Sequence, residues 1–187
     1  MMKKTILLLT VISLLVVCAG CRAKTYDENL AESSAAYDQL IDGFKERYGD
    51  QYIEDPLLSD FQDYPPYYHM AYPDDDGKLV VVVYDDSREI VREIRELAGK
   101  RDITVRLREE SDPDEVYREM KRIREYKGNN KAPFPWGHIG ENIRLNCVVV
   151  VVAADRMEFE MIRWFRENVS DSDMVRMIAY TVIQELV

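Results

Sequence analysis

The sequence predicts an α+β fold made of two ββαβ units that share a core, with one helix before the first unit and a linking helix between the units. Two valine-rich runs, residues 79–83 and 148–152, are typical of strands covered on both faces. Each run follows a short strand and a turn, and each precedes an amphipathic helical pattern and a closing strand pattern. Equivalent positions such as His69 and His138 are 69 residues apart. We interpret the two units as an internal duplication, although two hairpin–helix units can also resemble each other through common physics alone.

Composition excludes several classes of protein. The chain has 187 residues, of which 47% are hydrophobic, so a disordered chain is excluded. Its charges are spread along the sequence after residue 21, which excludes a protein with several membrane spans. The net charge of −10 argues against a nucleic-acid partner, because a phosphate backbone favours clustered Lys and Arg.

The body of the protein is predicted over residues 30–187. A helix is expected from Leu30 to Tyr48, followed by a loop packed by aromatic rings. Unit one covers about 67–108, and its first two strands are joined by a turn at residues 73–77 that contains Pro, Asp and Gly. Asp86 and Glu89 are the expected start of its helix, since this spacing is typical of a capping box.

The linking helix is predicted over 113–127, because Asp112 and Pro113 form a typical helix start and Gly128 a typical end. Unit two covers about 137–180, and Asp155 and Glu158 repeat the expected helix start. Neither unit can bury its valine run alone, so we expect the units to share a sheet or to pack closely.

The N-terminus indicates export. Residues 1–20 combine Lys3 and Lys4 with an apolar run and small residues, as a signal peptide does. The sequence Ala19-Gly20-Cys21 resembles the lipobox of bacterial lipoproteins, although Cys18 stands where that family usually has an aliphatic residue. The resemblance implies palmitate-type acylation of Cys21, a lipidated tether over 21–29, and a location at the extracytoplasmic face of a bacterial cell membrane in the cell envelope. An ordinary secreted signal or an uncleaved anchor is the alternative.

Cys147 would be the single cysteine of the processed chain with a free thiol, so no intramolecular disulfide is expected. It precedes the second valine run, which favours a buried and unreactive thiol.

No catalytic residues, metal site or cofactor are predicted. The chain has two histidines, His69 and His138, and lacks the glycine-rich motifs that bind nucleotide phosphates. We interpret both histidines as hydrogen-bonded residues at strand ends rather than as a metal pair. The run Asp74-Asp75-Asp76 is interpreted as turn chemistry, because its carboxylates are adjacent and not alternating as in a calcium loop.

Aromatic residues suggest where a partner binds. Tyrosines crowd the segment before the first hairpin, and Trp136 has the matching place before the second. A tyrosine ring combines a large rigid surface with a polar tip, which suits protein recognition. The candidate binding residues are therefore Tyr64, Tyr67, Tyr68 and Trp136, while the alternative is that these rings pack the loops onto the sheet.

The stretch from Tyr67 to Val83, with its Tyr-His-Met-Ala-Tyr-Pro-Asp-Asp-Asp-Gly sequence, resembles a group of secreted Firmicutes proteins. Those proteins are similar in turn to the pro-regions of alpha-lytic or streptogrisin-type serine peptidases, which chaperone or inhibit their protease. The resemblance lends weight to a role in contacting another protein. Together with the lack of catalytic motifs, it leads us to expect a non-enzymatic module for protein binding, of unknown partner. The alternative is a small-ligand carrier or hydrolase with a site between the two units that uses His69 or His138.

Overall fold

The computed structural model describes residues 24–48, 64–99, 102–143, 145–154 and 156–179. Within these residues the chain forms helices and strands in the order α2 (Tyr26–Tyr48), β1 (Tyr68–Pro73), β2 (Leu79–Val83), α3 (Arg88–Leu97), β3 (Thr104–Leu107), α4 (Pro113–Asn129), β4 (Trp136–Asn142), β5 (Cys147–Val152), α5 (Phe159–Asn168) and β6 (Val175–Ala179). The prediction of an α+β fold with two similar units is confirmed. The predicted signal peptide and Cys21 lie outside the described residues.

The two units have the same topology. Sheet A has the order β1-β2-β3 and sheet B the order β4-β5-β6, so each valine run is the central strand of its own sheet. In both sheets the first pair of strands is antiparallel and the second pair is parallel. The register shifts between Tyr68 and Met70 in β1 and between Trp136 and Ile139 in β4, so both hairpins carry an irregularity at the histidine position. The units therefore pack closely but do not share one sheet.

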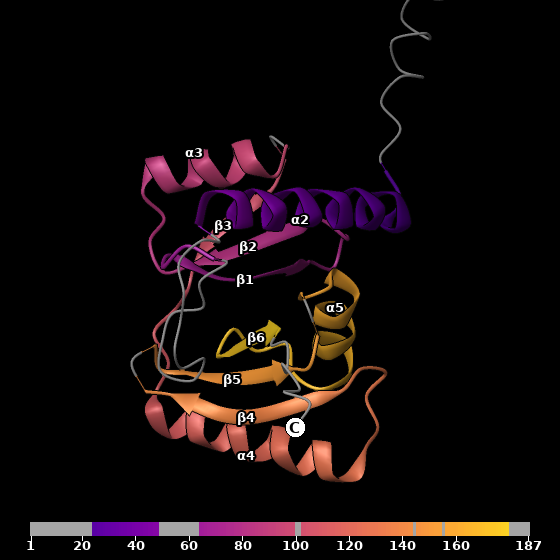
Figure 1. Cartoon of the computed structure of the whole chain (residues 1–187), viewed down its shortest axis with the longest axis vertical. Coiled ribbons are helices and arrows are strands. Elements are labelled where there is room, and N and C mark those ends of the chain that lie inside the picture. The colour runs from indigo at the N-terminus through magenta and orange to yellow at the C-terminus, as the bar shows by residue number, and fades with distance from the viewer. Residues whose placement is uncertain (1–23, 49–63, 100–101, 144, 155, 180–187) are drawn as a thin grey trace, which may run out of the picture.

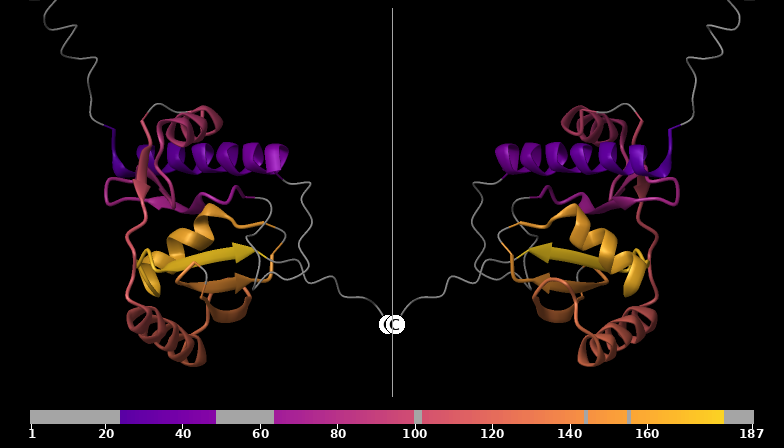
Figure 2. Two further views of the ribbon diagram at one scale, coloured as in Figure 1. Left: turned by 90° about the vertical axis from the view of Figure 1, so that its left-hand side faces the viewer. Right: turned by 90° about the vertical axis from the view of Figure 1, so that its right-hand side faces the viewer.

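The helices separate into layers (Figures 1 and 2). Helices α2 and α3 lie together at one end of the molecule, where α2 packs on β1 and β2. Helix α4 lies at the opposite end, against β4 and β5. Helix α5 lies between these ends and contacts β1 as well as α2, and β1 also contacts β6. The two units thus meet along β1, α5 and β6.

One apolar core extends through both units. Val81 of β2 and Val150 of β5 are fully buried and belong to the same hydrophobic cluster. Helix α2 contributes to both units, since the ring of Tyr37 lies 5.3 Å from that of Phe159 and its hydroxyl donates to the carbonyl of Met157 at 3.0 Å. Cys147 is buried, as predicted, in a smaller cluster on sheet B with Val149, Val151 and Ile178. Burial raises the pKa of its thiol, which keeps it unreactive.

Several helix ends differ from the sequence prediction. Helix α2 begins at Tyr26 rather than Leu30, because Thr25 and Glu28 form a reciprocal capping box. The predicted cap by Asp86 is wrong: Ser87 precedes α3, and the Oδ1 atom of Asp85 accepts the hydrogen bond from its N–H. The predicted cap by Asp112 is confirmed, since its side chain accepts from the N–H of Asp114.

Two glycines behave differently. Gly99 follows the end of α3 in the left-handed conformation, with φ +61°. Gly128 does not end α4, which continues to Asn129 and is followed by the cap residue Asn130. Among the described residues, no helix is long and apolar enough to cross a membrane.

Candidate functional site

Asp173 lies at the centre of the contact between the two units. It belongs to the turn 170–174, where backbone N–H groups are bound by serine hydroxyls: Ser172 N–H donates to Ser170 Oγ, and Met174 N–H donates to Ser172 Oγ. The carboxylate of Asp173 accepts hydrogen bonds from Arg106 of β3 and from the hydroxyl of Tyr72 on β1. One carboxylate of unit two is therefore bound by two side chains of unit one. We call this contact region between the units the seam.

Arg166 of α5 completes this cluster from the side of unit two. Its guanidinium lies 3.5 Å above the Tyr72 ring and 3.4 Å from the Asp173 carboxylate. Its side chain is only 14% exposed, and burial lowers its pKa although the Asp173 charge opposes this effect. The cation is thus held by a ring and a carboxylate rather than by water.

His69 is buried in the seam, where both ring nitrogens are hydrogen-bonded. The ring is fully buried, its Nδ1 atom lies 2.8 Å from the Tyr84 hydroxyl, and its Nε2 atom lies 2.8 Å from the backbone oxygen of Asp173. A carbonyl oxygen only accepts, so Nε2 carries the proton and Nδ1 accepts from the Tyr84 hydroxyl. Burial lowers the pKa of His69 well below its usual value, and the nearby Arg176 and Arg108 charges lower it further. The ring is neutral with both nitrogens engaged, so it has no free nitrogen to bind a metal or to take up a substrate proton.

The two histidines do not come together. His138 is exposed on β4, the outer strand of sheet B, whereas His69 is buried in β1. The prediction of a hydrogen-bonded histidine is confirmed for His69, although its place is inside a strand and not at a strand end. Among the described residues, no group of three or more His, Cys, Asp or Glu side chains could hold a metal ion.

Arg108, just after β3, ties unit one to the hairpin of unit two. Its Nε atom donates to the backbone oxygen of Asp173 at 3.1 Å, and its Nη atoms donate to the carbonyls of Leu145 at 3.2 Å and Asn146 at 2.7 Å. The pairing of Arg108 with Asp173 was not predicted from the sequence. No spacing in the sequence signals this pairing, because it depends on how the units dock.

In the acidic turn of the first hairpin, the side chain of Asp74 binds backbone N–H groups of the same turn. The Oδ1 atom of Asp74 accepts from the N–H of Asp76 at 2.9 Å and from that of Lys78 at 2.8 Å. Gly77 has φ +77°, a conformation that favours glycine. The interpretation as turn chemistry is confirmed.

The predicted binding tyrosines pack against α2. Phe44 of α2 makes edge-on contacts with the rings of Tyr64, Tyr67 and Tyr68. Tyr68 is a core residue with 4% exposure, whereas Tyr64 and Tyr67 are half-buried. A role of Tyr68 in contacting a partner directly is therefore hard to reconcile with its position, while the partner-binding role of Tyr64 and Tyr67 stays a prediction.

Trp136 lies in a second aromatic cluster at the start of β4. Its ring stacks with those of Tyr126 and Phe134, at interplanar angles of 23° and 20°, and lies 5.8 Å from that of Phe165. The side chain is half-buried. The structure brings Trp136 together with α4 and α5, and not with Tyr64, Tyr67 and Tyr68.

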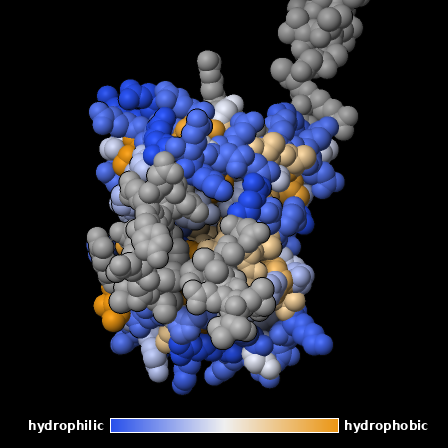
Figure 3. Space-filling model, viewed as in Figure 1, coloured by the Kyte–Doolittle hydropathy of each residue, from blue (hydrophilic) through white to orange (hydrophobic). Residues whose placement is uncertain are grey.

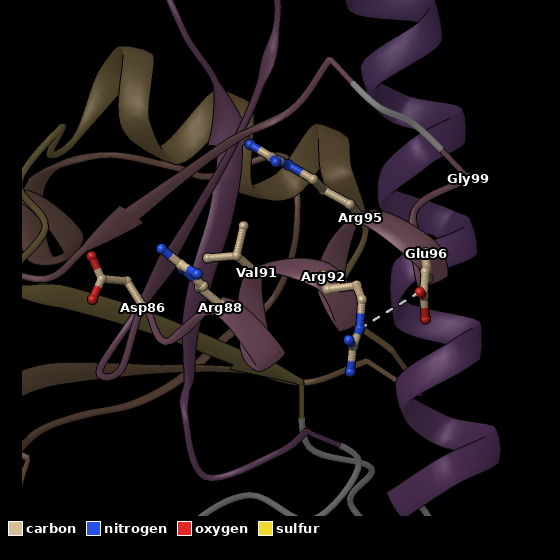
Figure 4. Close-up of a pocket in the computed structure, with 7 residues that line it drawn as sticks. All are labelled: Asp86, Arg88, Val91, Arg92, Arg95, Glu96 and Gly99. Carbon is tan, nitrogen blue, oxygen red and sulfur yellow. Dashed lines mark ion pairs between the residues drawn. The ribbon is translucent and has the colours of Figure 1, made fainter.

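Two pockets are candidate ligand sites. The cleft between the units has a volume of about 600 Å³ and is lined by residues that include Tyr72, Asp74, Arg106, Arg163, Arg166 and Asp171. Neither histidine lines it. The second pocket, which we call the α3 groove, measures about 540 Å³ and is lined by Asp86, Arg88, Val91, Arg92, Arg95, Glu96 and Gly99 (Figure 4).

In the view of Figure 3, hydrophobic residues form small patches on a mostly hydrophilic surface. Four large hydrophobic side chains are exposed among the described residues: Tyr26, Leu107, Tyr117 and Ile143.

Comparison with known families finds a similarity in the first part of the chain. Residues 22–109 match the model of a Pro-like N-terminal domain. The match runs through α2 and all of unit one, and ends just after β3. No curated protein and no solved structure matches the chain significantly. The predicted pro-region-like resemblance is thus confirmed for residues 22–109.

Proposed function

We propose that this protein is a non-enzymatic binding module that acts like a pro-region on another protein, as an inhibitor or chaperone of a secreted peptidase. The observation that carries the proposal is the match of residues 22–109 to a Pro-like N-terminal domain. The state of His69 supports it, because a buried, neutral ring with both nitrogens bonded is poorly placed for catalysis.

The alternative of a ligand carrier or hydrolase with a site between the units has less support. The cleft between the units is polar, but its arginines are engaged by protein groups: Arg106 and Arg166 by Asp173, and Arg163 by Glu160. Neither His69 nor His138 lines this cleft. The side chains around it hold the units together, which is a structural role.

We further propose that acylated Cys21 anchors the protein at the extracytoplasmic face of the cell membrane. The support is the sequence Ala19-Gly20-Cys21 after an apolar run. The anchor is tested by metabolic labelling with a fatty-acid probe in Cys21→Ser and, as a matched control, Cys18→Leu. We expect Cys21→Ser to lose the label and Cys18→Leu to keep it, whereas equal labelling of both would contradict the anchor.

The binding role is tested by crosslinking on intact cells, with Val81→Asp as a control that keeps the leader but disrupts the body. We expect the wild-type protein, and not the control, to recover a secreted peptidase. Purified residues 24–187 should then lower the activity of that peptidase or raise its refolding yield. A wild-type protein that recovers no peptidase, or has no effect on the one it recovers, would overturn the proposal.

A further inference from the structure

The four edge strands of the two sheets differ in what covers their outer edges. The edges at β1 and β6 face each other in the seam. The outer edge of sheet B is bound by α4, where Arg124 donates from Nη2 to the carbonyl of Ile139 at 2.7 Å and Lys127 donates to that of Gly137 at 2.5 Å. Within the described part of the chain, β3 pairs with β2 alone, and no side chain is seen to bind its outer edge. An uncovered edge offers hydrogen-bonding groups to another strand.

The orientation of β3 identifies these groups. The N–H of Arg108 donates to the carbonyl of Val83 in β2, at 2.7 Å. Backbone groups alternate along a strand, so the N–H and C=O of Arg106 also point to β2, whereas those of Val105 and Leu107 point away from it. Leu107 is 46% exposed. The outer edge of β3 therefore presents two donor–acceptor pairs beside an exposed apolar side chain.

The α3 groove lies near this edge. Helix α2 covers β1 and β2 and contacts α3, and Figure 1 shows α3 beside α2 on the β3 side of sheet A. Glu93 and Leu97 face α2, because Glu93 pairs with Arg47 and Leu97 lies against Gly43. Helical periodicity puts Arg88, Val91 and Arg95 on the opposite side, and Figure 4 shows these three side chains pointing together, apart from the Arg92–Glu96 pair.

The charges of this row are unusual for an acidic protein. The net charge of the chain is −10, yet Arg88 and Arg95 are exposed and form no ion pair with any described residue. Between them lies Val91, which is half-buried. Asp86 and Glu96 also line the groove, but neither pairs with Arg88 or Arg95. Two arginines without an ion-pair partner among the described residues, on either side of an apolar residue, favour an occupant with two carboxylates around an apolar side chain.

We propose that the outer edge of β3 accepts an extended acidic segment of a partner protein as an added strand, with its alternate side chains toward Arg88, Val91 and Arg95. Arg88 and Arg95 are seven residues apart, ~10 Å along the helix axis. Carboxylates four residues apart in a strand are separated by ~13 Å, which flexible arginine side chains can span. The matching pattern is acidic–x–apolar–x–acidic. Strand addition supplies main-chain hydrogen bonds, and the alternate side chains supply specificity. The proposal rests on the proposed function, because it names the surface and partner chemistry of a binding module.

The test uses two fluorescent peptides that differ in charge, Gly-Ser-Glu-Thr-Ile-Thr-Glu-Gly and Gly-Ser-Lys-Thr-Ile-Thr-Lys-Gly, titrated against residues 24–187. We expect the acidic peptide to bind at least tenfold more tightly than the lysine peptide. Arg88→Glu/Arg95→Glu should weaken its binding at least tenfold. The matched control is Lys45→Glu/Lys121→Glu, which changes the net charge equally at exposed lysines elsewhere and should leave binding unchanged.

A second pair of variants tests whether the backbone of β3, and not only the charge of α3, contributes to peptide binding. Leu107→Pro removes an outward N–H without breaking the ladder to β2, whereas Leu107→Ala removes the apolar side chain and keeps the N–H. We expect Leu107→Pro to weaken binding more than Leu107→Ala, with thermal melting of both variants as the check on folding. Equal binding of the two peptides, no binding of either, or equal effects of the two Leu107 substitutions would overturn the inference. If neither peptide binds but crosslinking on intact cells recovers a peptidase, this inference is rejected and the proposed function stands. If the acidic peptide binds as expected but no peptidase is recovered, only the proposed function is rejected.

Discussion

The two units share one topology but use equivalent strands in opposite ways. Unit one enters the seam with its first strand, β1, and unit two enters it with its last strand, β6. The outer edges are therefore β3 in unit one and β4 in unit two. Helix α4 covers the β4 edge through Arg124 and Lys127, while β3 is left open. Two similar units docked in this unsymmetrical way can differ in role, one closed and the other available to a partner.

The equivalent histidines show the same divergence. His69 lies in the seam with both nitrogens bonded, whereas His138 is exposed on the outer strand of sheet B. The position along the chain is equivalent, and the environment is set by which edge of each sheet enters the seam. The two units therefore share a scaffold but not the local chemistry at this position.

The largest expected effect concerns what the units have in common, their central strands. Val81→Asp and Val150→Asp should each unfold the protein, because an unpaired buried carboxylate costs several kcal/mol against a typical total stability of about 5–15 kcal/mol. Leu107→Asp, at an exposed strand position, is the control and should melt close to wild type. Circular dichroism melting checks this, and two valine variants that melt like the control would show that the sheets are wrongly assigned.

The next largest effect is expected at the seam, where the carboxylate of Asp173 joins the two units. Asp173→Ala should lower the free energy of unfolding by about 2–3 kcal/mol, because it leaves the half-buried Arg166 and the Tyr72 hydroxyl without their acceptor. Asp171→Ala in the same turn is the matched control, since Asp171 is exposed and makes no hydrogen bond that the structure records. Urea titrations of both variants give the values. Equal losses would mean that the Asp173 cluster does not hold the units together.

A smaller effect separates the two histidines by pH. The pKa of His69 is lowered by burial, so below about pH 6.5 the unfolded chain binds a proton at this ring that the folded chain does not. The free energy of unfolding should therefore decrease as the pH is lowered below about 6.5, and this group contributes up to ~1.4 kcal/mol per pH unit to that decrease. His69→Gln should remove that component between pH 6.5 and 5.5, and His138→Gln should retain it. Urea titrations at several pH values check this, and parallel pH profiles for wild type and His69→Gln would contradict a buried neutral His69.

The smallest effect concerns the closed outer edge. Arg124→Ala/Lys127→Ala should cost about 1 kcal/mol or less of unfolding free energy, since bonds between exposed side chains and backbone are weak. Exposure of the β4 edge should be visible instead as concentration-dependent association in sedimentation velocity. Arg118→Ala/Lys121→Ala on the same helix is the control. A monomeric Arg124/Lys127 variant at all concentrations would show that these side chains do not protect the edge.

Local patterns in the sequence predicted the strands and the turns well. The valine runs became central strands because continuous apolar residues need cover on both faces. The Asp112–Pro113 start of α4 was predicted correctly because capping is local chemistry. The N-terminus of α3 was missed because Ser87 and Asp85 offered an equally local alternative to Asp86.

The docking of the units could not be predicted in the same way. The pairing of Asp173 with Arg106 and Arg108 joins residues far apart in the sequence, and 35 acidic side chains offer many such partners. The tyrosine segment was ambiguous for a similar reason. Tyrosine packs as well against Phe44 as it does in an interface, and the structure places Tyr68 in the core.

Amide hydrogen exchange along β3 tests the central claim, an open edge beside a closed seam, most directly. In the free protein, the amides of Val105 and Leu107 should exchange much faster than those of Arg106 and Arg108, which face β2. The acidic peptide should slow Val105 and Leu107 selectively and leave the amides of β6 unchanged. Uniform protection along β3 in the free protein, or no change at Val105 and Leu107 with saturating peptide, would contradict the account.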